Sequence, residues 1–556
     1  MVPIRLLGAS AALFLSSVCV AAPQLPEGTI PGWEDALARY KEVMGRKPFR
    51  MHTEGRSRIA ETRSPEALPI LATDYAKPQA YPEHTKYTIA TLLGRHFDRL
   101  ADLSAIAALR RGHTKPIDTW LWVQALRLEI DRNGPEEALA IVRDDKDVHH
   151  RAAAIAAIGS SSRPELKEAL VPVCMDFPKK EFERNLLIGA MTGALWENRK
   201  RINEEGYRAA IEAYIGLLAT DVGLGHTIKV QMARHLQEIF DSPAMWVNPE
   251  PWLEILQRGE VKQKKDNETT AGPSFFGVTT DGERFVYVVD MSDSMLKPIE
   301  PSAKPDNVPT TGPRKKPKKK KILDESDLPW HEIHTRWDLA REQLIISLSR
   351  LTPDKHFAVV WFGTETGTLK STKGMVKATS TNVKRVVDEL KSIQQEPLDA
   401  SRGENSSTHP DGKLKGETNL HGGLRLAFAL ADKGFVEEPA YVDEDAITEG
   451  CDTIFVVTDG RPSSDDFVVA DKDYGEGKVV RNRESNAEAP RSPTLLYHGP
   501  YVADDWLLAD VARMNSFRRI RLYAIGIGEA NMRLLEELAK IGNGEAFSFG
   551  KKQKQD

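Results

Sequence analysis

The feature that most constrains the fold is a change of hydrophobic period near residue 274. Beyond it, short apolar runs rich in β-branched and aromatic residues alternate with segments of helical period. The runs are "RFVYVVD", "HFAVVWFG", "DTIFVVTDG" and "IRLYAIGIG". Near-continuous apolar strands separated by helices are typical of a parallel sheet covered on both faces. Residues 274–556 are therefore expected to form a doubly wound α/β domain, and such domains bind ligands beyond the carboxyl ends of their strands.

The preceding region, residues 86–258, shows helical patterns only. Apolar residues recur at intervals of three and four, as at Ile228, Met232, Leu236 and Ile239. Comparable second helices begin near His150, Arg184 and Ile228, at intervals of 34 and 44 residues, and helix pairs at such periods are typical of a solenoid. The stretch "DDKDVHHRAAAIAAIG" resembles a HEAT-type repeat. We expect an all-α, HEAT-like helical-repeat domain here, and an irregular helical bundle is the alternative.

The remaining segments are expected to lie outside these two domains. Residues 1–22 combine one basic residue, an apolar run and a small-residue end, the pattern of a secretory signal peptide. This predicts an exported product, periplasmic or secreted, with no transmembrane segment beyond the signal peptide. Residues 23–85 are rich in Pro, Arg and Glu and are expected to be a loosely structured lead-in. Residues 259–273 have the composition of a linker.

Charge and cysteine content narrow the function further. The net charge of −5 argues against a general nucleic-acid-binding protein, which is usually basic. Beyond the signal peptide there are two cysteines, Cys174 and Cys451, far apart in sequence. They are expected to be free thiols, because two such distant residues are no disulfide framework.

Oxygen-bearing side chains gather where two of the predicted strands end. In "FVYVVDMSDSML" the apolar strand ends in Asp290, and Ser292 and Ser294 follow at alternate positions. In an extended loop these three would project to one side. Thr418 precedes a predicted helix in "GETNLHGGL", and Asp459 closes the strand of "DTIFVVTDG". All five are hard oxygen ligands, which suit Mg²⁺, Mn²⁺ or Ca²⁺.

Together these motifs resemble a von Willebrand factor A domain with a metal-ion-dependent adhesion site. The resemblance covers about residues 274–550. It implies a doubly wound sheet, usually with one antiparallel edge strand. It also implies Mg²⁺ or Mn²⁺ held by Ser292, Ser294 and Thr418, with Asp290 and Asp459 ligating directly or through water. The family's metal keeps one open position for a carboxylate from a partner protein.

Two positions depart from that family pattern. Asp293 and Glu417 stand where the family often has glycine. Insertions are also expected in the domain, near 298–330, 396–415 and 462–500. The first contains the lysine-rich run "RKKPKKKK", and like-charge runs of this kind favour a solvated, extended loop.

These features predict an exported, metal-dependent protein–protein binding protein and not an enzyme. A metal-dependent hydrolase or phosphatase-like enzyme is one alternative. Phosphatases whose first strand ends in Asp typically carry a second Asp two residues later as the acid, and Ser292 stands there. A scaffold in which the metal only staples loops is the other alternative. The hydroxyl residues would be plain turn and cap residues if no metal bound.

Overall fold

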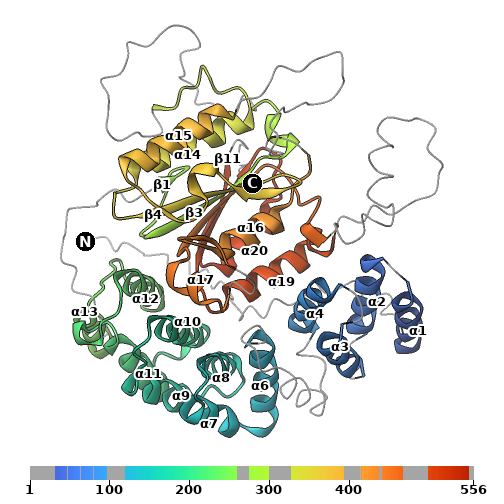
Figure 1. Ribbon diagram of the computed structural model, residues 1–556. Coiled ribbons are helices and arrows are strands. Elements are labelled where there is room, and N and C mark those ends of the chain that lie inside the picture. Colours follow the sequence, from blue (N-terminus) through green and yellow to red (C-terminus); the bar gives the residue numbers. More distant parts are fainter. Residues whose placement is uncertain are drawn as a thin grey trace, which may run out of the picture.

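The computed structural model contains a helical region and an α/β domain (Figure 1). It describes residues 32–46, 48–62, 64, 66–78, 81–96, 119–258, 274–299, 327–393, 414, 416–436, 441–467 and 499–549. The expected signal peptide, the linker and most of the three expected insertions lie outside these residues.

The α/β domain is built on a mixed sheet whose long strands are parallel. Its order is β11-β10-β9-β3-β4-β5, and β6 also pairs with β4. The strands are β3 (Arg284–Asp290), β4 (His356–Phe362), β5 (Thr366–Thr368), β6 (Val376–Lys377), β9 (Thr453–Thr458), β10 (Arg521–Ile527) and β11 (Ala546–Phe549). Only β5 and β6 run antiparallel, both against β4. The predicted parallel sheet is confirmed, and an antiparallel edge strand is present.

Helices cover both faces of this sheet (Figure 1). They are α14 (Arg336–Arg350), α15 (Ser380–Ser392), α16 (Leu420–Ala429), α19 (Asp504–Asn515) and α20 (Met532–Ile541). Along β3, Val286 and Val288 pack with α16, α19 and α20, whereas Phe285, Tyr287 and Val289 pack with α14 and α15. Alternate side chains of a strand point to opposite faces. Burial on both faces therefore explains why the sequence of this strand is continuously apolar.

The helical region stacks in two layers. Its helices are α6 (Thr119–Asn133), α7 (Glu136–Asp144), α8 (Val148–Ser160), α9 (Leu166–Met175), α10 (Glu181–Glu197), α11 (Glu205–Gly216), α12 (His226–Ile239) and α13 (Pro249–Arg258). Helices α6, α8, α10 and α12 contact one another in order, and so do α7, α9, α11 and α13. Each helix thus packs against the second helix after it, as in a solenoid. This packing supports the predicted solenoid over an irregular bundle.

The expected loose lead-in is instead a group of packed helices. It comprises α1 (Trp33–Met44), α2 (Phe49–Glu61), α3 (Ala67–Ala76) and α4 (Pro82–His96). A buried ion pair joins α2 to α3, with 2.8 Å between Arg56 Nε and Asp74 Oδ2. The apolar core of these helices also contains Phe467, Tyr501 and Trp506 of the α/β domain. The lead-in prediction was wrong because these helices bury apolar residues against one another, against α6 and against the α/β domain, and part of that partner surface lies about 400 residues away in the sequence.

The stacked helices contact the α/β domain near the amino ends of its strands. Helix α10 packs against α17 (Glu444–Glu449), which precedes β9. Arg234 of α12 lies 3.3 Å from the Asp452 carboxylate, and both residues are buried. The same carboxylate accepts hydrogen bonds from the N–H groups of Glu283 and Arg284. Asp452 therefore ties the start of β3 to the helical region.

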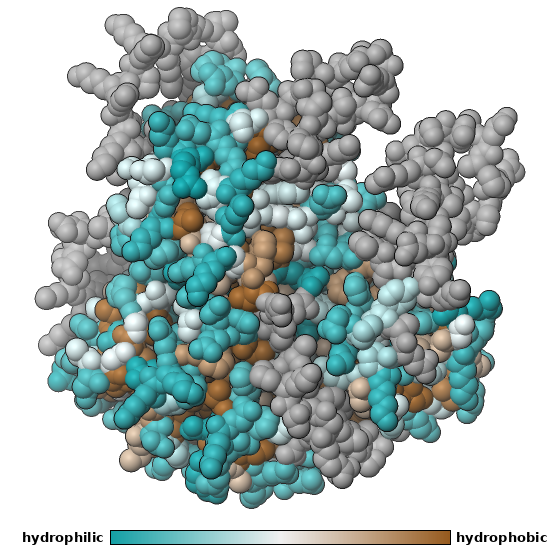
Figure 2. All heavy atoms as spheres, in the orientation of Figure 1, coloured by the Kyte–Doolittle hydropathy of each residue, from teal (hydrophilic) through white to brown (hydrophobic). Residues whose placement is uncertain are grey.

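None of the described helices has the length and apolar character needed to cross a bilayer. Hydrophilic residues make up most of the described surface seen in Figure 2, with apolar residues in small groups between them.

Cys174 and Cys451 are both free thiols, as predicted.

Replacing Asp452 by Asn should destabilise the protein strongly. The change leaves the Arg234 guanidinium buried without its counter-charge, and breaking a buried pair in this way costs about 3–5 kcal/mol. Urea unfolding of the Asp452→Asn variant measures the effect. Asp144→Asn is the control, because its pair with Arg143 is exposed, and it should unfold like the wild type. Equal unfolding of all three proteins would contradict the role assigned to Asp452.

Candidate metal centre

Two carboxylates meet where neighbouring strands end. Asp290 is the last residue of β3, and Asp459 directly follows β9. These strands pair in parallel, with Val289 opposite Val457, so both side chains lie at the same edge of the sheet. Along the chain, β3 is followed by β4 on one side and later by β9 on the other. This reversal of strand order is where open α/β sheets bind ligands.

Ser292 and Ser294 join the two carboxylates. The Ser292 N–H donates to Asp290 Oδ1 at 2.8 Å, and the two serine hydroxyls lie 3.0 Å apart. The Ser294 hydroxyl then donates to Asp459 Oδ1 at 2.6 Å. A 3₁₀ turn, η5 (Asp293–Leu296), brings Ser294 back over the sheet edge. The predicted convergence is present, but a tight turn produces it and not the fully extended loop that the spacing suggested.

Thr418 reaches the same place from a third segment. It lies just before α16, and Asn419 caps that helix by accepting a hydrogen bond from the Gly422 N–H at 2.8 Å. A Cβ atom on Gly460 would lie 3.6 Å from Thr418 Oγ1 and 3.8 Å from Ser294 Oγ. The two hydroxyls therefore flank the space that this glycine leaves open. Hydrogen bonds thus join Asp290, Ser292, Ser294 and Asp459, and Thr418 lies beside Ser294 at Gly460.

Asp293 has a structural task beside this cluster. Its N–H donates to the Gly416 carbonyl at 3.1 Å, and its carboxylate accepts from the Gly416 N–H at 2.7 Å. Gly416 has a positive φ of 83°, a conformation that glycine adopts readily. Asp293 thus clamps the segment that carries Thr418 onto the Asp290 loop.

The sequence interpretation missed two residues of the site. Thr458 donates its hydroxyl to Asp290 Oδ2 at 2.6 Å, and Arg336 donates to Asp459 Oδ2 at 2.5 Å. Arg336 is the buried first residue of α14, and a Cβ on Gly528 would lie 2.7 Å from its guanidinium carbon. Thr458 was discoverable, since it directly precedes Asp459 at a strand end. Arg336 follows the first insertion, and no local pattern indicated its direction.

The electrostatics of the cluster suit a cation. Asp290 is fully buried, and this burial together with the nearby charge of Asp459 raises the pKa of Asp290 to about 7. A cation between the carboxylates would relieve their repulsion. With Arg336 counted, the three charged groups carry one net negative charge, so a divalent ion would stay under-neutralised. The donors are all hard oxygens, which fits Mg²⁺, Mn²⁺ or Ca²⁺.

Metal sites built from three or more His, Cys, Asp or Glu side chains are not found in the described part of the chain. The present cluster differs in kind, because it combines two carboxylates with three hydroxyls.

Comparisons with known proteins add no family assignment. No protein-family model and no curated protein matches the chain. The resemblance to the von Willebrand factor A family thus depends on the motif residues and on the geometry described above.

The raised pKa of Asp290 predicts a pH-dependent stability when chelator is present. The folded protein keeps a proton that the unfolded chain releases, so the free energy of unfolding should fall as pH rises from the ordinary carboxyl range to about 7. Each pKa unit corresponds to about 1.4 kcal/mol. Urea unfolding across this range should show a clearly flatter profile for Asp290→Asn. Asp388→Asn, an exposed change on α15, should keep the wild-type profile, and identical profiles for all three proteins would refute the assignment.

Proposed function

We propose that this protein is an exported, metal-dependent protein-binding protein. In this proposal residues 274–556 form a von Willebrand A-type domain. Asp290, Ser292, Ser294, Thr418 and Asp459 hold Mg²⁺ or a similar divalent ion. A carboxylate of a partner protein takes the ion's open position, and the stacked helices carry the domain.

The convergence of three loops supports this proposal most directly. Ser294 lies 2.6 Å from Asp459, Ser292 lies 3.0 Å from Ser294, and Thr418 faces the same open space at Gly460. Capping and turn formation do not require hydroxyls from separate loops to meet two buried carboxylates. Neutral hydroxyl ligands leave the charge of an ion largely uncancelled, which favours an anionic partner.

The alternatives receive less support from the same contacts. A metal that only staples loops has little to add, because Asp293, Ser294 and Ser463 already join the loops by hydrogen bonds. An enzyme would need a base or nucleophile beside the ion. Among the described residues, the side chains that hydrogen-bond to the five ligand residues from outside them are Thr458, Arg336 and Ser463. None of these three carries a carboxylate or an imidazole that could act as a general base.

Mg²⁺ should stabilise the wild-type protein and should be required for partner capture. Binding to the folded state alone raises the melting temperature. Thermal unfolding with Mg²⁺ or chelator measures the first effect, and a pull-down from the exported fraction measures the second. Ser292→Ala and Thr418→Ala should reduce both effects, whereas Ser380→Ala, an exposed change on α15, should not. Capture that persists in chelator, or in Ser292→Ala, would overturn the proposed binding mode.

Arg336 should set how strongly the site attracts its ion. Arg336→Gln removes the positive charge from Asp459 Oδ2, so the variant should melt lower in chelator and gain more from Mg²⁺ than the wild type does. Arg336→Lys keeps a positive charge and should resemble the wild type more closely. Calorimetric titration with Mg²⁺ gives the affinities. A weaker Mg²⁺ affinity in Arg336→Gln would show that the arginine positions Asp459 for the metal instead of competing with it.

A further inference from the structure

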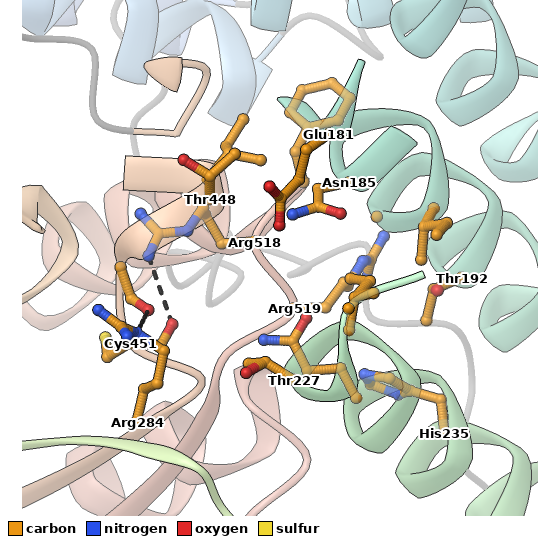
Figure 3. Close-up of a pocket in the computed structure, with 18 of the residues that line it drawn as sticks. Glu181, Asn185, Thr192, Thr227, His235, Arg284, Thr448, Cys451, Arg518 and Arg519 are labelled. Carbon is orange, nitrogen blue, oxygen red and sulfur yellow. Dashed lines mark hydrogen bonds between the residues drawn. The ribbon is translucent and has the colours of Figure 1, made fainter. Parts of the chain in front are cut away.

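A pocket lies between the helical region and the α/β domain, at the amino ends of the strands. The candidate metal centre lies at their carboxyl ends. The cavity volume of the pocket is about 110 Å³. Residues of α10 and α12 line one side, and residues that precede β9 and β10 line the other (Figure 3). Nothing in the proposed metal binding uses this pocket.

Among the arginines that line this pocket, Arg519 has the fewest hydrogen-bond acceptors for its guanidinium group. Its guanidinium lies against α10, where a Cβ on Gly193 would be 1.7 Å from Nη2. Its Nε is buried without a hydrogen-bond partner, and none of the described hydrogen bonds gives the rest of the guanidinium an acceptor. Burial lowers the pKa of Arg519, and Glu197 acts on it only through its charge. Arg519 is partly buried, and a cation in such a position gains from a charge-assisted hydrogen bond to an anion.

Neighbouring arginines at this interface are already engaged. Arg284 donates to the Gly450 carbonyl at 2.9 Å, and Arg518 donates to the Cys451 carbonyl at 3.4 Å. Figure 3 marks both contacts, while the Arg519 side chain extends toward the pocket between Thr192 and Thr227. Arg234 faces Asp452. Arg519 is thus the cation of this group that has room for an added ligand.

Neutral polar groups surround the same space. Asn185, Thr227 and Gln231 line the pocket as partly buried side chains. Within the described part of the chain, none of these three has a side-chain hydrogen bond. Glu181 also lines the pocket, but it is exposed and lies on the first turn of α10. A guanidinium, two amides and a hydroxyl therefore line the same pocket, and all four can donate to oxygen.

We propose that this pocket binds a small oxyanion, such as a phosphate, sulfate or carboxylate group, through Arg519. Asn185, Thr227 and Gln231 supply the neutral hydrogen bonds. Charge-assisted bonds from arginine to such groups are the strong ones, and the small volume suits a single anionic group. Since Arg519 belongs to the α/β domain and the three neutral residues to α10 and α12, the anion would bridge the two parts of the protein.

The test measures melting of the full chain in chelator, so that an ion at the metal centre plays no part. Sodium phosphate, sodium sulfate and sodium acetate are each titrated against sodium chloride at matched ionic strength. At least one oxyanion should raise the melting temperature of the wild type in a saturable way. Arg519→Gln should weaken that binding by about tenfold or more, and Thr227→Ala should weaken it less. Arg533→Gln, an exposed change on α20, should bind like the wild type.

Because each variant is compared with itself in chloride, a lower melting temperature of Arg519→Gln does not obscure the result. No saturable shift in the wild type with any of the three anions would overturn the proposal. An equal shift in Arg519→Gln would overturn it as well. The anion titration is done in chelator, so a failure of the proposed Mg²⁺ binding at the carboxyl ends of the strands would not change its outcome.

Discussion

The burial of two carboxylates at the ends of adjacent strands is the constraint on which the site depends. Asp290 is fully buried and Asp459 nearly so, and each needs compensation. Ser292 and Thr458 donate to Asp290, while Ser294 and Arg336 donate to Asp459. These donors come from the loop after β3, from the end of β9 and from the start of α14. The need to satisfy two acids therefore brings three separate segments together.

The N-terminal helices support the same edge of the sheet indirectly. Ser463 exchanges two hydrogen bonds with the backbone of Thr418. Four residues later, Phe467 stacks on Phe49 of α2 and packs against Tyr87 of α4. The segment that follows Asp459 is thus held between the candidate metal centre and the first four helices. These helices bear on the site by fixing the position of this segment, although they contribute no ligand.

Local chemistry explains how much the sequence could predict. Strands buried on both faces are continuously apolar, so the sequence predicted β3, β4, β9 and β10. Four of the five candidate ligand residues, Asp290, Ser292, Ser294 and Asp459, lie at or just after the ends of β3 and β9. Arg336 could not be found in this way, because its direction depends on Gly528 and Asp459, which are remote in sequence. The same holds for α1–α4. Their apolar core also contains Phe467, Tyr501 and Trp506, and no local period reveals a partner on another domain.

The amino ends and the carboxyl ends of the strands have different neighbours, and this difference decides how a partner would approach. Helices α10 and α12 contact the segments before β9 and β10, where Asp452, Arg234 and Arg519 lie. The amino ends of the strands thus join the α/β domain to the stacked helices. At the carboxyl ends of the strands, the hydroxyls of Ser294 and Thr418 lie around Gly460. A protein that offers a carboxylate to an ion there would meet the loops of the α/β domain first. Among the described helices outside that domain, α1–α4 are the ones that pack against the segment beside these loops, so added contacts to the partner would come from them rather than from the stack.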